Sequence, residues 1–211
     1  MEQRRRSKSD IQEEIYTVLQ DVLGQVNTWL HFAEAKNAAL IAFNTAVLSS
    51  ILEQLSNETC ALNVKYLYMI CGIMAIISTV VCLVSFFPNS KANCNEKGRK
   101  EEPAKFNLEL YSHIAVLAEN KYLIKLYKSY YNIVVNEGEL NAREKNIESE
   151  IIANSKIAIK KYTLFKVALV IIIVTIVLFV GISLLDGINI LESSKSEQVL
   201  ANIQMSMMIT R

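Results

Sequence analysis

The chain is poor in the residues that build catalytic and metal sites. It has only two histidines, His31 and His113, and neither belongs to an HExxH motif or to another spacing that brings metal ligands together. A Gly-rich phosphate loop, a nucleophile elbow and a kinase signature are also missing. We therefore expect no enzyme activity, no cofactor and no metal ion.

Cysteine is scarce as well, and its placement argues against a disulfide framework. Of the four cysteines, Cys71 and Cys82 lie inside an apolar segment, and Cys60 and Cys94 flank it. We expect buried, unreactive thiols.

The 211 residues include only six glycines and two prolines, the residues that interrupt helices. Neither occurs from Leu140 to Val180, and no proline separates Asp10 from Leu55. The sequence also contains no internal repeat and no alternating β-strand pattern. These absences predict an all-α protein with unusually long helices.

Apolar residues, in contrast, are abundant. They make up 52% of the chain, and the mean hydropathy is +0.25, which is high for a soluble protein. A bilayer core of ~30 Å needs about 20 mostly apolar helical residues. Three segments meet this condition, residues 38–55, 66–87 and 164–185. We therefore predict an all-α membrane protein with three transmembrane helices in contact with a lipid bilayer.

The basic residues predict the orientation of these spans. Four of them lie within the first ten residues and thirteen lie from Lys91 to Lys161, whereas residues 56–65 hold one and residues 186–211 hold two. Lysine and arginine are enriched on the cytoplasmic side of membrane proteins. We therefore place the N-terminus and the central segment in the cytoplasm and the C-terminus outside. The net charge of +1 gives no reason to expect a nucleic-acid polymer as a partner.

The segments outside the spans are also predicted to be mostly helical. Residues 1–33 contain an amphipathic helix that continues into a transmembrane hairpin at 34–87, and residues 88–105 read as a polar linker. Residues 106–163 form a cytoplasmic αα-hairpin, with one helix over 106–135, a turn at 136–139 and a second helix that runs into the third span. Residues 186–211 form an extracytoplasmic tail.

The apolar stripes of these cytoplasmic helices allow two interpretations. They either form the interior of a bundle made by the N-terminal helix and the hairpin, or they dock in part onto a partner chain or a second copy. Both can hold, because three amphipathic helices make a thin core.

Small residues recur along one face of the first span. Ala38, Ala42, Ala46 and Ser50 are four residues apart, with Ser49 and Glu53 adjoining them. Small residues let membrane helices approach closely. The second span has a comparable face, formed by Cys71, Ala75, Ser78, Cys82 and Ser85. We expect these two faces to pack together or to pack between subunits of a homo-oligomer.

Asn44 lies inside the first span, where a polar side chain seeks a protein or water partner. One interpretation is ordinary helix packing. The functional alternative is a water-lined path formed on oligomerisation, for which Asn44, Thr45, Ser49 and Glu53 are lining candidates. Glu34 and Lys36 are expected at the cytoplasmic rim, because a charge at the bilayer centre costs about 2.5 to 3.5 kcal/mol.

Three stretches resemble the transmembrane module of Pycsar effector proteins. They are FAEAKNAALIAFNTAVLSSIL at 32–52, YSHIAVLAENKYL at 111–123 and ESEIIANSKIAIKKYTLFKVALVIII at 148–173. Glu34, Lys36, Lys160, Lys161 and Tyr162 match the family pattern. Glu34 stands where aspartate is more frequent, and Asn37 stands where a smaller residue is usual.

The resemblance implies a bacterial anti-phage role in the inner membrane. Infection raises a cyclic pyrimidine nucleotide, the effector impairs membrane integrity, and growth stops before phage matures. Only about 35 residues precede the first span, fewer than the ~50 of a self-folding sensor domain. Sensing is therefore expected from a separate sensor protein or from the hairpin by an unfamiliar mode, or not at all. The alternative is a non-toxic membrane adaptor that binds a cytoplasmic protein through its hairpin.

Overall fold

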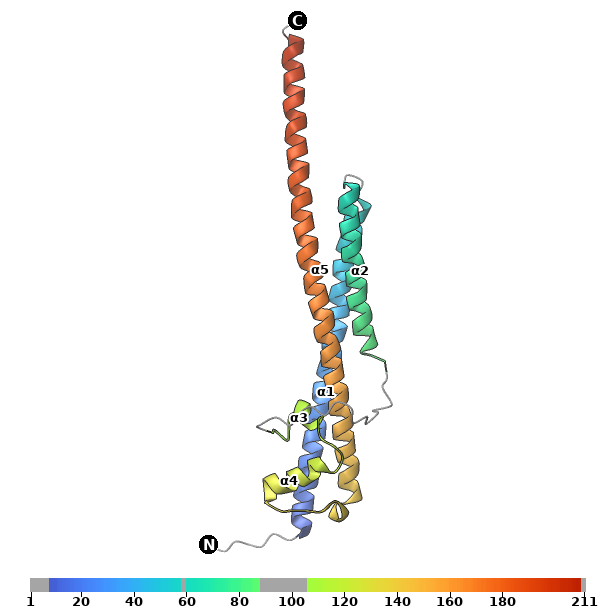
Figure 1. Ribbon diagram of the computed structural model, residues 1–211, viewed down its shortest axis with the longest axis vertical. Helices are drawn as coiled ribbons and strands as arrows, with labels where there is room; N and C mark the ends of the chain where they lie inside the picture. Colours follow the sequence, from blue (N-terminus) through green and yellow to red (C-terminus); the bar gives the residue numbers. More distant parts are fainter. Residues whose placement is uncertain (1–7, 58–59, 88–105, 210–211) are drawn as a thin grey trace, which may run out of the picture. The chain divides into compact units, whose positions relative to one another are not determined.

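The structure is a computed structural model that describes residues 8–57, 60–87 and 106–209 (Figure 1). Its elements are α1 (Lys8–Ser56), α2 (Leu62–Val84), α3 (Tyr111–Ile114), α4 (Lys121–Tyr131), the 3₁₀ turn η1 (Glu137–Glu139) and α5 (Ala142–Ile209). No strand occurs among the described residues, so the all-α prediction is confirmed. The basic residues Arg4, Arg5 and Arg6, the predicted linker and Cys94 lie outside the described residues.

Three helices, α1, α2 and α5, are long and apolar enough to cross a membrane. The first and third predicted spans are parts of longer continuous helices, since no proline interrupts them. The second helix ends at Val84 and not at Phe87, because residues 85–87 turn just before Pro88. The residue before a proline is disfavoured in the helical conformation, which accounts for this early end.

The predicted C-terminal tail is helical as far as Ile209. Gly181 and Gly187 lie within α5 without ending it. A glycine costs about 1 kcal/mol relative to alanine in a helix, which is too little to stop a helix that is already long.

The chain divides into two compact units. We call the described residues within 1–38 and 84–165 the bundle unit, and those within 39–83 and 166–209 the span unit. The helices α1, α2 and α5 each contribute residues to both units.

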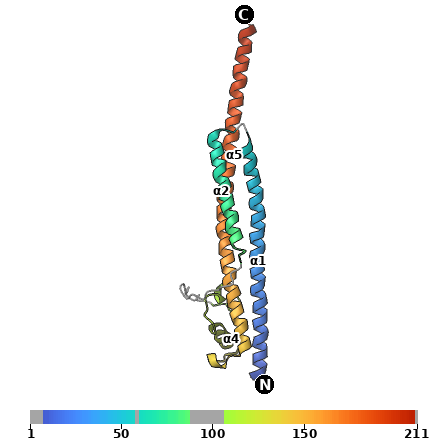
Figure 2. The same cartoon turned by 90° about the vertical axis from the view of Figure 1, so that its right-hand side faces the viewer.

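A hydrophobic core holds the bundle unit together. Buried residues from α1, α4 and α5 meet there, together with Ile114 of α3 and Leu117 after it. Figure 2 shows α4 beside the part of α5 that belongs to this unit. The core includes Ile15, Leu19, Val22 and Val26 from α1, Tyr122, Leu123, Leu126 and Tyr127 from α4, and Ile151 and Ile152 from α5. The apolar stripe of α1 is therefore buried within the chain, as the bundle interpretation requires.

The first arm of the predicted hairpin differs from expectation. We predicted one helix over residues 106–135, but the structure has the single turn of α3 followed by α4, with non-helical residues between them. Asn120 precedes α4 with a positive φ of 64°, a left-handed conformation that asparagine tolerates better than most residues. Buried side chains continue through the break at Leu117, so the apolar spacing gave no sign of it.

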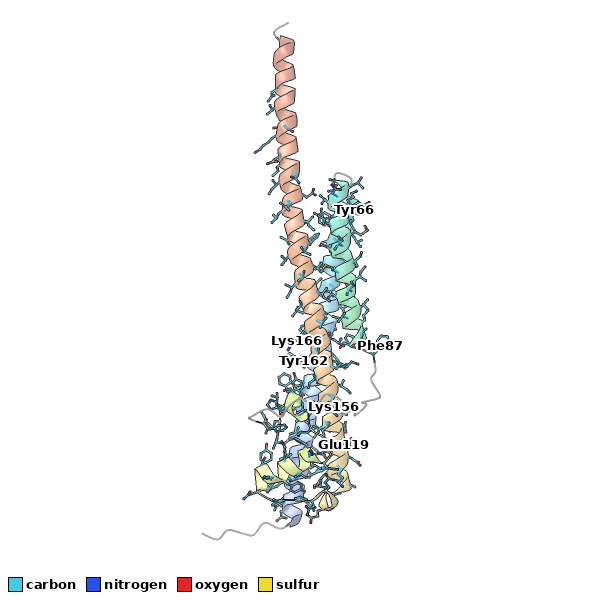
Figure 3. The ribbon with its side chains drawn as sticks, in the orientation of Figure 1. Tyr66, Phe87, Glu119, Lys156, Tyr162 and Lys166 are labelled. Carbon is cyan, nitrogen blue, oxygen red and sulfur yellow. The ribbon has the colours of Figure 1, made fainter. Side chains whose placement is uncertain are left out.

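The span unit exposes apolar side chains along α2 and α5 (Figure 3). They include Ile70, Ile73, Ile77 and Val80 on α2, and Val170, Ile173 and Val177 on α5, each about half exposed or more. Such a continuous apolar surface is unfavourable in water and suits lipid. The chain is therefore a membrane protein.

Glu148 of α5 caps α4 across the bundle unit. Its carboxylate accepts backbone N–H bonds from Asn120, Tyr122 and Leu123, each 3.1 Å long. Asn120, the residue at the N-cap position, makes no side-chain cap of its own. Only 1% of Glu148 is exposed, and burial raises its pKa against the lowering effect of these three N–H donors.

Replacing Glu148 with leucine keeps a similar volume but removes the acceptor for three backbone donors. We expect the bundle unit to lose about 2–4 kcal/mol of stability, since a buried donor without a partner costs ~1–3 kcal/mol. Unfolding in detergent can be followed by the fluorescence of Trp29, which lies in the same unit and is the only tryptophan.

Glu150→Leu is the matched control, because Glu150 is exposed on the same helix and should change stability by less than about 0.5 kcal/mol. An equal loss in both variants would contradict the capping role.

The raised pKa of Glu148 also makes stability depend on pH. Its contribution to the free energy of unfolding is fully present below the ordinary pKa of 4.5 and is lost as pH rises through the raised pKa. In Glu148→Leu the decrease in stability between pH 4.5 and the raised pKa of Glu148 should therefore disappear.

Candidate functional site

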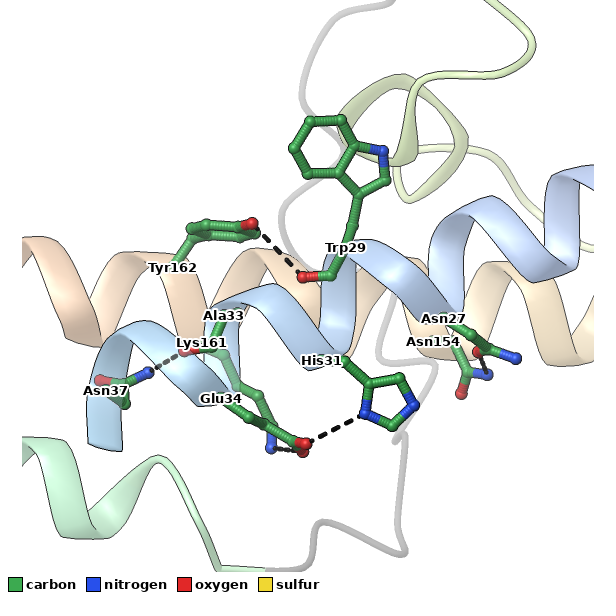
Figure 4. A network of polar contacts seen from close by, with 9 residues as sticks. All are labelled: Asn27, Trp29, His31, Ala33, Glu34, Asn37, Asn154, Lys161 and Tyr162. Carbon is green, nitrogen blue, oxygen red and sulfur yellow. Dashed lines mark hydrogen bonds and ion pairs between the residues drawn. The ribbon is translucent and has the colours of Figure 1, made fainter. Parts of the chain in front are cut away.

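An ion pair joins α1 and α5 in the bundle unit, just before the first and third spans. The Lys161 ammonium donates to the Glu34 carboxylate, and His31 Nδ1 lies 3.5 Å from the same carboxylate (Figure 4). The hydrogen bond from Lys161 is the main cause that lowers the pKa of Glu34, and burial opposes it. Glu34 is therefore ionised at neutral pH and holds Lys161 in place.

Aromatic contacts surround Tyr162 next to this pair. Its hydroxyl donates to the Trp29 carbonyl at 3.3 Å (Figure 4). Its ring stacks on Tyr111 with centroids 5.7 Å apart. The Lys36 ammonium lies 5.4 Å from the Tyr162 ring and 5.1 Å from the Phe32 ring. Cation–π contacts of this kind keep a lysine close to aromatic rings.

Asn37 is fully buried in the bundle unit. Its amide nitrogen donates to the Ala33 carbonyl at 2.9 Å and to Ser85 Oγ, just after α2, at 3.1 Å. Its amide oxygen has no partner among the described residues. The larger side chain at this position thus reaches from α1 to the end of α2, which a smaller residue could not do.

A pocket of about 280 Å³ opens beside the ion pair. Lys160 and Lys161 of α5, Glu34 of α1 and Ser85 supply its polar groups. Its apolar lining consists of Leu30, Val84, Phe86, Phe87, Ile157 and Leu164. The pocket therefore combines a positive region with an apolar wall.

Asn44 makes the central polar contact of the span unit. It is 1% exposed, and its amide lies 2.9 Å from the hydroxyl oxygen of Ser78 and 3.2 Å from that of Thr79. The Ser78 hydroxyl also donates to the Ala168 carbonyl at 2.9 Å. One asparagine and one serine thereby connect α1, α2 and α5.

The small face of the first span is exposed in the single chain. Ala38, Ala42, Ala46 and Ser50 are all exposed, and so are the adjoining Ser49 and Glu53 and the lining candidate Thr45. The buried side of α1 in the span unit carries Leu40, Asn44 and Ile51 instead, on the opposite side of the helix at about 100° per residue. The interpretation in which the two small faces pack together within one chain is therefore wrong, and packing between subunits stays a prediction.

The hydroxyls on that exposed face are satisfied by their own helix. Thr45 donates to the Ile41 carbonyl at 2.9 Å, and Ser49 donates to the Thr45 carbonyl at 3.0 Å. Side chains bonded in this way can face lipid without an unpaired donor.

The predicted face of the second span is buried, as Cys71, Ala75, Ser78, Cys82 and Ser85 are all nearly inaccessible. Its serines contact buried asparagines of α1, Ser78 with Asn44 and Ser85 with Asn37. The spacing of small residues correctly identified the buried side of α2. On α1 the same spacing marks the exposed side of the helix.

Sequence reasoning missed a polar contact at the other end of the spans. The Cys60 thiol donates to the Asp186 carboxylate at 3.1 Å, and this hydrogen bond raises the pKa of Cys60. The two residues are 126 positions apart, and no sequence signal connects them. No group of His, Cys, Asp and Glu within the described residues could hold a metal ion.

The Pycsar effector protein domain matches residues 18–185 of the chain. The chain belongs to this family. No curated protein and no solved structure matches the chain. Membership in the Pycsar effector family supports a role as an effector in anti-phage defence.

The residues that carried the family resemblance lie in one region of the bundle unit. Glu34 and Lys161 pair with each other, Lys36 lies against Tyr162, and Lys160 lines the pocket. In this Pycsar effector the pattern thus joins α1 to α5 where both helices approach their spans.

A double-mutant cycle tests the ion pair. We expect Glu34→Gln and Lys161→Gln to show a coupling of about 0.5–1 kcal/mol in unfolding followed by Trp29 fluorescence, because the partly exposed Glu34 is screened by solvent. The coupling should be present above the ordinary Glu34 pKa of 4.5 and be lost as pH falls through the lowered pKa. Glu34→Gln combined with Lys166→Gln should be additive, and coupling in that control would contradict a specific pair.

A second variant tests the contact in the span unit. Asn44→Leu removes the hydrogen bonds to Ser78 and Thr79, and we expect it to cost about 0.5–2 kcal/mol, the range measured for hydrogen bonds between membrane helices. Thermal unfolding in detergent, followed by circular dichroism, measures this loss. Phe43→Leu changes the neighbouring exposed position and should leave the midpoint nearly unchanged.

Proposed function

We propose that this protein is a non-enzymatic effector of the bacterial inner membrane that impairs membrane integrity when activated. Its bundle unit lies in the cytoplasm and its C-terminus lies outside. A cyclic pyrimidine nucleotide made during phage infection is the signal, and it acts through a separate sensor protein or directly on the bundle unit. The result is growth arrest before phage matures.

The family match is the main support, and the exposed small face of α1 suggests how the effector works. Lipid gives membrane helices little hydrophobic reason to associate, so close approach of small residues is a common basis for assembly. Ala38, Ala42 and Ala46 form such a surface, which the single chain leaves open. A homo-oligomer would cover it and bring the α1 helices of several copies together.

Polar groups on the same face are the candidates for a conducting path. Thr45, Ser49 and Glu53 lie on the exposed side of α1, so oligomerisation through this face would place them between subunits. Their hydroxyl and carboxylate oxygens could then face water and ions. Asn44 lies on the opposite, buried side, and its proposed role is helix packing.

The adaptor alternative has less support. It needs an apolar surface on the cytoplasmic helices for a partner, but the stripe of α1 and most apolar residues of α4 are buried in the bundle core. Recovery of one stoichiometric partner together with a lack of toxicity would favour it.

Overproduction in bacteria tests the proposal. We expect the wild type to depolarise the inner membrane and arrest growth, measured with a potential-sensitive dye and by optical density. Ala46→Leu should weaken both effects at least about tenfold, because a bulky side chain on the small face prevents close approach of subunits.

Ile77→Phe adds bulk to an exposed position of α2 outside that face and serves as the control, with expected activity like the wild type. Immunoblots of membrane fractions must show equal amounts of each variant. Unchanged potential and growth on strong overproduction of the wild type would refute the membrane-damaging proposal.

A further inference from the structure

The pocket beside the Glu34–Lys161 pair has an excess of positive charge. Lys161 is matched by Glu34, whereas Lys160 is exposed and forms an ion pair with no carboxylate among the described residues. Two ammonium groups and one carboxylate leave a net charge of +1 in the lining. An anion would therefore be attracted to this pocket.

Ser85 adds a buried hydrogen-bond donor to the same pocket. Only 4% of Ser85 is exposed, and its oxygen accepts from Asn37 Nδ2 at 3.1 Å. Its own hydroxyl proton goes to no acceptor within the part of the chain that the structure describes. A buried hydroxyl normally finds an acceptor, so this donor is available to a ligand.

The remaining lining is apolar and lies where the helices meet the membrane. Phe86 and Phe87 follow the end of α2, and Leu164 begins the predicted third span. A free inorganic anion gains no binding energy from contact with apolar side chains. A lipid carries an anionic group and an apolar chain together, so it can contact both parts of the pocket. Basic pockets between membrane helices are known to hold anionic headgroups.

We infer that this pocket binds the phosphate of an anionic phospholipid. Lys160 provides the charge for the phosphate and Ser85 donates a hydrogen bond to it. The side chains of Phe86, Phe87 and Leu164 contact the start of the acyl chains. Glu34 limits the affinity, because it repels the phosphate and holds the second ammonium group. This inference rests on the membrane insertion of the chain and not on its toxicity.

Native mass spectrometry of the full-length protein in neutral detergent tests the inference. The probes are dioleoyl phosphatidylglycerol and dioleoyl phosphatidylcholine, with excess inorganic phosphate as a competitor. We expect bound phosphatidylglycerol, much weaker binding of phosphatidylcholine, and no displacement by inorganic phosphate. Displacement by phosphate at concentrations similar to those of the lipid would show that a free anion is the ligand and would overturn the lipid assignment.

Two variants should change the affinity in opposite directions. Lys160→Gln should raise the dissociation constant for phosphatidylglycerol about fivefold, the effect of one lysine near an anionic surface. Glu34→Gln should lower it by at least about twofold, since the repulsion is removed and Lys161 is released. General damage to the fold cannot produce tighter binding.

Lys166→Gln is the control, because it removes the same charge six positions further along α5, on a different side of the helix. It should bind phosphatidylglycerol like the wild type. Equal losses in Lys160→Gln and Lys166→Gln, or a loss in Glu34→Gln, would overturn the pocket assignment in favour of unspecific attraction to charged lipid. The measurement does not depend on growth arrest, so its outcome is separate from that of the proposed function.

Discussion

Helices inside a bilayer gain little from covering apolar surface, because lipid tails are as apolar as leucine. Their association therefore depends on close contact and on polar groups that find partners. In the span unit this role falls to Asn44, which meets the hydroxyls of Ser78 and Thr79, and to Ser78, which reaches the Ala168 carbonyl. The small residues of α2 let these groups approach one another. The arrangement of the three spans follows from this constraint.

The bundle unit shows the opposite balance. Its helices are held by a core of buried apolar residues, as in a soluble protein. Two carboxylates buried in this unit have structural tasks. Glu148 supplies the cap that α4 lacks, and Glu144 accepts a hydrogen bond from the Tyr127 hydroxyl at 3.0 Å. Buried carboxylates are tolerated here because they satisfy donors that would otherwise be unpaired.

The residues of the family pattern lie together in the bundle unit. Contacts across α1 and α5 join Glu34 to Lys161 and Lys36 to Tyr162, and none of these residues belongs to a group that could hold a metal ion in the described structure. In these contacts charges pair and an aromatic ring covers a lysine. We interpret the pattern as a connection between α1 and α5 within the bundle unit.

The sequence by itself determined the helical class, the three spans and the continuity of α1 and α5, because these depend on local apolar content and on the absence of proline. It also indicated the buried stripe of α1 and the buried face of α2, which follow from periodicity. The tertiary structure alone decided which side of α1 faces its neighbours in the span unit, where α3 and α4 break, and that Glu148, Cys60 and Ser85 have distant partners. Such features depend on contacts between residues far apart in the chain, and the spacing of residues along one helix carries no information about the position of another.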